Sequence, residues 1–207
     1  MWSWVNACVD LVVQYPNWAL GLAFLAAIIE AVALFGTIIP GTFILMAIAG
    51  AAGAAGHSML PYLILAIIGA VIGDFISYWV GHRYRMTLRS AWPFASRPHL
   101  LEHADRFFHR FGSFSVAICR FIPVLRSTVP LAAGVAGMTR RRFVVANVLS
   151  AFVWAPAHVY PAQFAGITID RLQHGEAENA VMWAGAALLC GLGIWMAHRQ
   201  LIRRTRI

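Results

Sequence analysis

Four ionisable side chains lie within otherwise apolar stretches of the sequence: Glu30, Asp74, Arg120 and Arg126. Arginine stays charged at any accessible pH, and placing one at the centre of a bilayer costs about 2.5–3.5 kcal/mol even on lenient insertion scales. Two arginines six residues apart therefore need an anionic partner or a hydrated cavity. The planar guanidinium also suits bidentate contacts with phosphate. The segment from Arg120 to Arg126 is the first place to look for function.

Two readings of these four residues are open. In the structural reading, each carboxylate pairs with an arginine, and the buried pairs fix the geometry of the chain without adding net stability. In the functional reading, Arg120 and Arg126 bind a phosphate. Glu30 and Asp74 then exchange protons, because a carboxyl group in surroundings of low dielectric constant can load and release a proton near neutral pH.

The composition indicates the class of protein. Of 207 residues, 60% are hydrophobic and 12% are charged, whereas soluble domains are about 45–50% apolar and about 25% charged. Several apolar stretches approach the roughly 20 residues that cross a bilayer. We therefore predict a single-domain, all-α polytopic membrane protein. The net charge of +8 fits arginines in loops beside apolar spans better than it fits a nucleic-acid partner.

Interruptions in the apolar stretches predict the order of elements. Pro and Gly break two of these stretches, which are therefore expected to form re-entrant helical hairpins rather than full spans. The hairpins cover residues 36–56 and 113–138, and their breaks are Gly36, Pro40 and Gly41 in the first and Pro123, Pro130 and Gly134 in the second. Around them we expect a short interfacial helix at 1–16, spans at 17–35, 59–80, 143–169 and 180–198, and an amphipathic surface helix within 81–112.

Charge placement predicts the orientation. If residues 113–138 re-enter, thirteen of the sixteen arginines fall on one side, and the positive-inside rule places both termini in the cytoplasm. The two hairpins then open on opposite sides, as in an inverted repeat. In such repeats, half-helix N-termini meet at mid-membrane and build a binding site from their free N–H groups.

Other polar residues within the spans have mainly structural explanations. Asn147 is expected to hydrogen-bond between helices, His158 to be a satisfied buried histidine, and Tyr78 and Trp154 to pack or to lie at an interface. The histidines at 99, 103 and 109 lack metal-site spacing, and the three cysteines are far apart, so we expect no metal and no cofactor.

Together these residues resemble the DedA family, which shares its core with the eukaryotic VTT-domain lipid scramblases. The resemblance covers about 30–154. It rests on Glu30, the Phe35-Gly36 and Pro40-Gly41 break, Gly73-Asp74 with Tyr78 and Gly81, Phe111-Gly112, the stretch from Arg120 to Arg126, Ala133-Gly134, Gly137-Met138, Phe143, Asn147 and Trp154.

The resemblance implies a transporter in the bacterial inner membrane that is not an enzyme. It implies a flippase, driven by the proton-motive force, that recycles undecaprenyl phosphate or moves phospholipid. Arg120 and Arg126 would bind the lipid phosphate, and Glu30 and Asp74 would couple protons. Many members carry an acid where this chain has Thr42, so proton coupling here would depend on Glu30 or Asp74.

Three rival functions remain open at this point: a proton-coupled cation or drug antiporter, a membrane lipid-phosphate enzyme, and a non-catalytic assembly factor. The small residues of 47–56 would pack helices either within one chain or between two chains of a homodimer.

Overall fold

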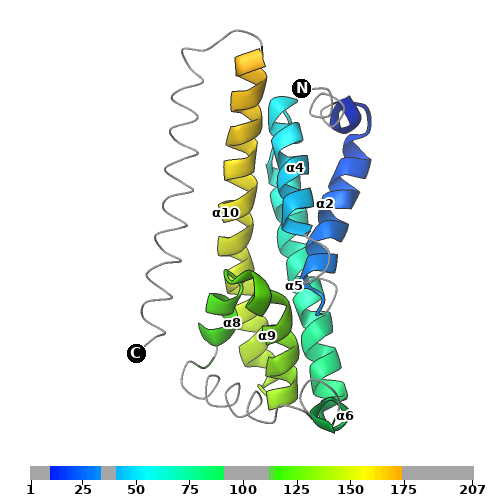
Figure 1. The fold of residues 1–207 in the computed structure, drawn as a ribbon, viewed down its shortest axis with the longest axis vertical. Helices are drawn as coiled ribbons and strands as arrows, with labels where there is room; N and C mark the ends of the chain where they lie inside the picture. The colour runs from blue at the N-terminus through cyan, green and yellow to red at the C-terminus, as the bar shows by residue number, and fades with distance from the viewer. Residues whose placement is uncertain (1–9, 34–40, 91–111, 113, 174–207) are drawn as a thin grey trace. The chain divides into compact units, whose positions relative to one another are not determined.

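The computed structural model describes residues 10–33, 41–90, 112 and 114–173, and the regular elements in these ranges are all helices (Figure 1). This confirms the all-α class for the described part. The helices are α2 (Pro16–Ala31), α4 (Gly41–Ala54), α5 (Leu60–Arg83), α6 (Arg85–Ser90), α8 (Phe114–Cys119), α9 (Pro123–Ala136) and α10 (Arg140–Gln173). The breaks at Gly36 and Pro40, most of the predicted interfacial and surface helices, and the predicted span at 180–198 lie outside the described residues.

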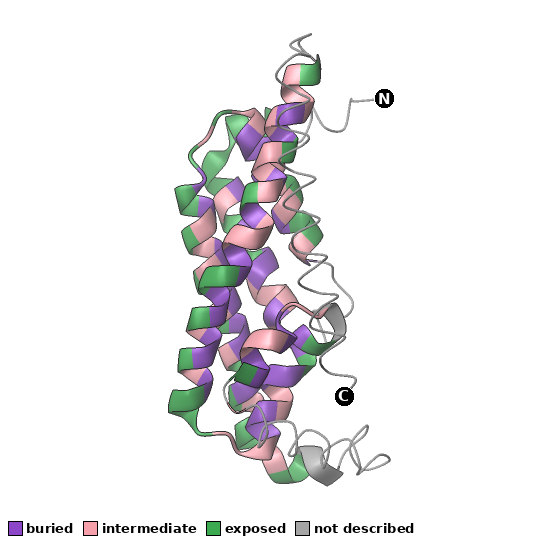
Figure 2. Ribbon diagram, turned by 90° about the vertical axis from the view of Figure 1, so that its left-hand side faces the viewer, coloured by how far each residue is buried: buried purple, intermediate pink, exposed green. Residues whose placement is uncertain are grey.

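Two of the described helices, α5 and α10, are long and apolar enough to cross a membrane. The apolar helices α2 and α4 are shorter, with 16 and 14 residues. Figure 2 shows buried and exposed residues alternating around the helices. Large apolar side chains lie on the exposed sides, among them Trp18, Phe43 and Leu149. An outward face of this kind suits contact with lipid tails.

The helix α10 differs from its prediction at both ends. It begins at Arg140 and runs without interruption through Pro156 and Pro161 to Gln173. The predicted span of 143–169 left out the three arginines at 140–142, because charge is a poor signal for where a helix starts. They occupy the first turn of α10 instead of a loop.

The chain forms two compact units. The first contains residues 1–23, 43–65 and 155–207, and the second contains 24–42 and 66–154. In the first unit, α4 packs against the second half of α10 through glycines. A Cβ atom added at Gly50 would lie 3.2 Å from the carbonyl oxygen of Ala162, and one at Gly53 would lie 2.7 Å from that of Gln163. Some of the small residues of 47–56 therefore pack helices within one chain.

Gly166 of α10 has the tightest of these contacts, because an added Cβ would overlap the backbone of Gly50. We expect Gly166→Leu to lower the free energy of unfolding by about 1–3 kcal/mol, the usual range for overpacking. Thermal unfolding of the protein in detergent measures this. Gly21→Leu is the matched control, since nothing lies within 4 Å of a Cβ there. Equal melting temperatures for the two variants would contradict the close packing.

In the second unit, α5 contacts both α2 and α9 at glycines. Cβ atoms added at Gly69 and Gly73 would lie 2.7 and 2.6 Å from carbonyl oxygens of α2. On α9, a Cβ at Gly134 would lie 2.6 Å from the backbone nitrogen of His82. These close approaches bring α2 and α9 against the stretch of α5 that carries Asp74.

A small aromatic core ties α5, α8, α9 and α10 together in the same unit. The rings of Tyr78 and Phe143 stack with centroids 4.2 Å apart, and the Tyr78 hydroxyl donates a hydrogen bond of 2.6 Å to the carbonyl of Met138. Val116 and Ala133 complete the contact from α8 and α9. Tyr78 is therefore a core residue with a satisfied hydroxyl.

The segment between α8 and α9 is a broken helix. After Cys119 the chain turns at 120–122, and α9 begins with Pro123. Ile122 is extended, with φ −110° and ψ 111°, the conformation that a following proline favours. Pro130 and Gly134, which the sequence indicated as further breaks, lie inside α9, and the helix ends at Gly137 with a φ of 82°. That this segment re-enters the membrane on one face stays a prediction.

Candidate functional site

Arg120 lies in a fully polar setting that we call the clasp, formed with Asp74, Asn147 and Ser150. Its Nη1 donates hydrogen bonds to the Asn147 carbonyl (2.7 Å) and the Ser150 hydroxyl (2.6 Å). Its Nη2 donates to the Asp74 carboxylate, in an ion pair, and to Oδ1 of Asn147 (3.1 Å). All four residues are buried. The clasp joins the turn after α8 to α5 and α10.

Arg126 lies in a second group, the Arg126 cluster, with Glu30, Thr42 and Trp154. Its Nη1 donates to Oε1 of Glu30 at 2.9 Å, in an ion pair, and to the Thr42 hydroxyl at 3.1 Å. The Thr42 hydroxyl in turn donates to the same Glu30 oxygen. The guanidinium carbon lies 3.9 Å from the centroid of the Trp154 ring, a close cation–π contact.

One edge of the Arg126 guanidinium is unused. Among the described residues, neither Nε nor Nη2 has a hydrogen-bond partner, although the residue is only 5% exposed. These two nitrogens form the side of the guanidinium that makes parallel hydrogen bonds to a carboxylate or phosphate. On Arg120, by contrast, both terminal nitrogens are used, and only Nε lacks a partner within the part of the chain that the structure describes. The two arginines therefore differ in what they can still bind.

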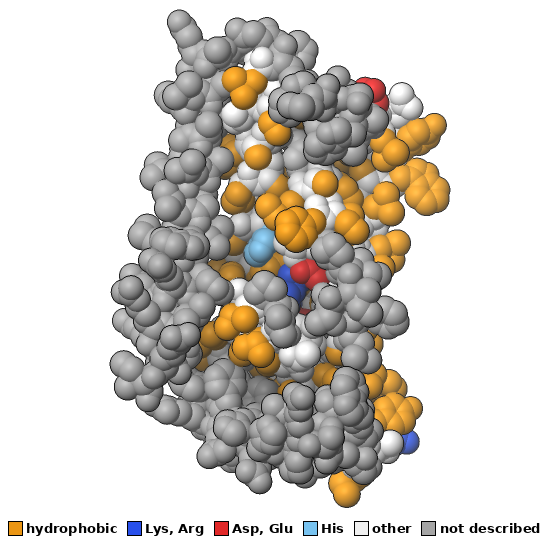
Figure 3. All heavy atoms as spheres, in the orientation of Figure 1, with side chains coloured by type: hydrophobic (Ala, Val, Ile, Leu, Met, Phe, Trp, Pro, Cys, Tyr) orange, Lys and Arg blue, Asp and Glu red, His pale blue; other side chains and the backbone are white. Residues whose placement is uncertain are grey.

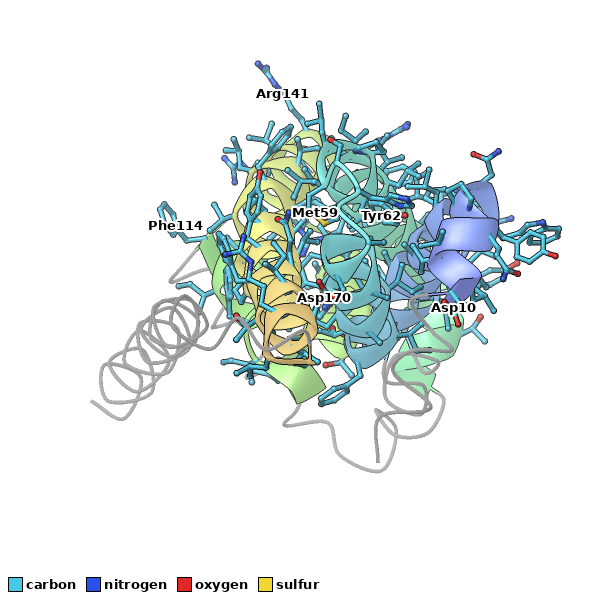
Figure 4. All side chains as sticks on the ribbon, turned by 90° about the horizontal axis from the view of Figure 1, so that it is seen from above. Asp10, Met59, Tyr62, Phe114, Arg141 and Asp170 are labelled. Carbon is cyan, nitrogen blue, oxygen red and sulfur yellow. The ribbon has the colours of Figure 1, made fainter. Side chains whose placement is uncertain are left out.

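The polar interior contrasts with the outside of the helices. Among the described side chains on the face in Figure 3, most are hydrophobic, and a basic and an acidic group lie side by side. In Figure 4, Phe114 of α8 and Arg141 of α10 point away from the helices, and both are exposed.

Backbone contacts position Glu30. It lies one residue before the end of α2. Ser77 of α5 fixes that end, because the Ser77 hydroxyl accepts a hydrogen bond from the Ala33 N–H (2.8 Å) and lies 3.1 Å from the Ala31 carbonyl. Gly41, the first residue of α4, allows the chain to come close, because a Cβ there would lie 2.8 Å from that of Glu30. Ser77 and Gly41 thus set where the carboxylate meets Arg126.

The first turns of α4 and α9 meet in the Arg126 cluster, since Thr42 is the second residue of α4 and Arg126 the fourth of α9. A helix N-terminus carries roughly half a positive charge. Few free N–H groups come from α9, because Pro123 has none, and Leu125 and Arg126 donate to the Ile122 carbonyl. The helices therefore add a positive field, while donors for a ligand come mainly from the guanidinium.

The structure sorts the predicted site residues into two groups. The ion pairs of the structural reading are both present, Glu30 with Arg126 and Asp74 with Arg120. Asn147 belongs to the clasp and Trp154 to the Arg126 cluster, while Tyr78 belongs to the core. Sequence reasoning missed Ser77 and Ser150. Each follows a predicted polar residue by three positions, Asp74 and Asn147, so helical spacing could have found them.

Comparison with known proteins gives consistent matches. The family model of the VTT domain matches residues 26–164. Inner membrane protein YabI of Escherichia coli K12 is 28% identical over 192 residues, 91% of this chain and 74% of that protein. Protein DedA of the same strain is 27% identical over 200 residues, covering 95% and 90%. An uncharacterised membrane protein of Synechocystis, slr0232, is 32% identical over 171 residues, covering 80% and 78%. No solved structure matches the chain.

Proposed function

Since the chain belongs to the VTT-domain family, that of the DedA membrane proteins, we propose that it carries a lipid with a phosphate headgroup across the membrane. The candidate lipids are undecaprenyl phosphate and phospholipid. The lipid tail stays in the bilayer, and only the headgroup enters the protein. We place the protein in the bacterial inner membrane, with both termini in the cytoplasm.

The observation that carries this proposal is the unused edge of Arg126. A buried guanidinium with two free donors is costly unless a partner satisfies them. The N-termini of α4 and α9 add positive potential beside it. A phosphate oxygen pair fits the Nε and Nη2 edge, whereas an ammonium or other cation is repelled.

Arg120 has a different role in this proposal. Its terminal nitrogens already bind Asp74, Asn147 and Ser150, so a phosphate would have to displace a complete hydrogen-bond set. We therefore assign the headgroup to Arg126 and treat the clasp as the support that fixes the turn between α8 and α9. The sequence had given both arginines the same role.

Proton coupling fits Glu30 better than Asp74. Glu30 shares Arg126 with the incoming phosphate, so protonation of Glu30 would release Nη1 and strengthen the positive field as the phosphate binds. The Asp74 carboxylate instead accepts a hydrogen bond from Arg120 in the clasp. We propose that one proton on Glu30 accompanies each phosphate headgroup.

Lipid binding tests the proposal. The protein, purified in a neutral detergent, is offered undecaprenyl phosphate and phosphatidylethanolamine in equal amounts, and the retained lipid is read by native mass spectrometry. We expect selective retention of the prenyl phosphate. Equal retention of both lipids would favour a broader phospholipid scramblase, and retention of neither would contradict the proposal.

The rival functions are separable by direct assays. An antiporter would exchange a cation at Glu30 or Asp74, each of which pairs with an arginine through one oxygen. Transport of lipid without cation exchange in vesicles would exclude it. An enzyme acting on lipid phosphates would release free phosphate on incubation with undecaprenyl phosphate, and we expect none.

A further inference from the structure

The indole ring of Trp154 covers one side of the Arg126 guanidinium. The guanidinium carbon lies 3.9 Å from the centroid of the ring. An approach this close is made over the face of the ring, since the atoms at the ring edge would keep the carbon farther away. Because Trp154 is only 1% exposed, the side chains packed around it hold the ring in one place.

The hydrogen bonds of Arg126 fix only one corner of its guanidinium. Within the described residues, both partners, Glu30 and Thr42, bind the same nitrogen, Nη1. Bonds at one corner leave a rigid plane free to turn about the Cζ–Nη1 axis, and such a turn changes the direction of the opposite edge, Nε and Nη2. The ring of Trp154 opposes this turn, because the plane keeps its cation–π contact only while it stays over the ring face.

One face of α10 contacts both arginines. Asn147, Ser150 and Trp154 follow one another at intervals of three and four residues, so they lie on one side of the helix. The first two bind Arg120, in the turn after α8, and the third lies against Arg126 of α9. This face of α10 therefore positions the two arginines on either side of the break between α8 and α9.

Building on the proposed function, we propose that Trp154 is a positioning residue for the phosphate headgroup. It acts through Arg126 and does not bind the headgroup itself. Its ring holds the Nε and Nη2 edge in the orientation that meets the phosphate, so two parallel hydrogen bonds form with little further loss of side-chain freedom. The affinity for the headgroup then depends on the electron density of the ring face as well as on the volume that the ring fills.

A series of fluorinated tryptophans separates these two contributions. Fluorine withdraws electrons from the ring face and weakens a cation–π contact, while the size of the side chain hardly changes. Tryptophan with one, two or three fluorine atoms is incorporated at position 154 alone, and the full-length chain in maltoside detergent is titrated with dodecyl phosphate. We expect the affinity to fall with each added fluorine. Trp154→Leu, which removes the ring, should bind at least about tenfold more weakly than the natural chain.

Phe143→Leu is the matched control, because Phe143 is also a fully buried ring of α10 but stacks on Tyr78, outside the Arg126 cluster. It should lower the melting temperature and leave the affinity unchanged. The fluorinated chains keep the packing, so they decide the question if Trp154→Leu does not fold. An affinity that stays constant or rises with fluorine content would overturn the positioning role. If the natural chain bound dodecyl phosphate no better than Arg126→Gln, the proposed function itself would fail.

Discussion

Replacing Arg126 with alanine is expected to abolish lipid-phosphate binding; because it also leaves Glu30 without its ion-pair partner, thermal unfolding of the variant is measured alongside. The variant removes the only guanidinium among the described residues whose Nε and Nη2 are both free and buried. Truncating one partner of a desolvated charge pair costs about 2–5 kcal/mol, so affinity should fall at least about 30-fold. The measurement is titration with undecaprenyl phosphate in detergent, together with the flipping rate in proteoliposomes.

Lysine at the same position separates charge from geometry. A lysine ammonium keeps the positive charge but cannot offer two parallel N–H groups, so we expect Arg126→Lys to recover only a small part of the affinity. Arg141→Ala is the control, because this exposed arginine points away from the helices (Figure 4). If Arg126→Ala bound and flipped lipid at the natural rate, the assignment of the headgroup would be wrong.

Replacing Arg120 with alanine should instead destabilise the protein. The variant leaves the Asp74 carboxylate, which is 3% exposed, without its ion-pair partner and removes a donor from Asn147 and Ser150. Breaking a buried ion pair from one side costs about 3–5 kcal/mol. Thermal unfolding in detergent and the yield of monodisperse protein measure this loss.

Asp74, the acidic residue of the clasp, provides the control. Adding Asp74→Asn to Arg120→Ala removes the unpaired charge, so we expect the double variant to regain much of the lost stability. A phosphate-binding Arg120 would behave differently, because the double variant would then regain stability without regaining lipid binding. That outcome would contradict the division of roles between the two arginines.

The sequence predicted the elements that depend on length and apolar content. The spans that became α5 and α10 are apolar stretches long enough to cross a bilayer. Pro123 marks the start of α9 because proline has no N–H to lose at a first helical position. Pro130 misled the prediction, since packing against α5 at Gly134 holds α9 together around a residue that would break an isolated helix.

The candidate site was predictable in its members but not in its pairing. Glu30, Asp74, Arg120 and Arg126 are conspicuous because charge is rare in apolar spans. Which acid meets which arginine depends on contacts between residues 46 and 96 positions apart, and local spacing carries no information about such distances. Thr42 was noted for the acid it lacks, while its bridging hydrogen bonds became visible only with α2, α4 and α9 in place.

The prolines of α10 have a mechanical consequence. Pro156 and Pro161 lack an N–H, so the carbonyl groups of Phe152 and Ala157 have no partner four residues ahead. A helix bends most readily where such bonds are absent. Trp154 lies between Phe152 and Pro156, within this easily bent part of the helix. Its ring lies against the Arg126 guanidinium. We therefore expect any bending of α10 at this stretch to act first on the ring that lies against the guanidinium.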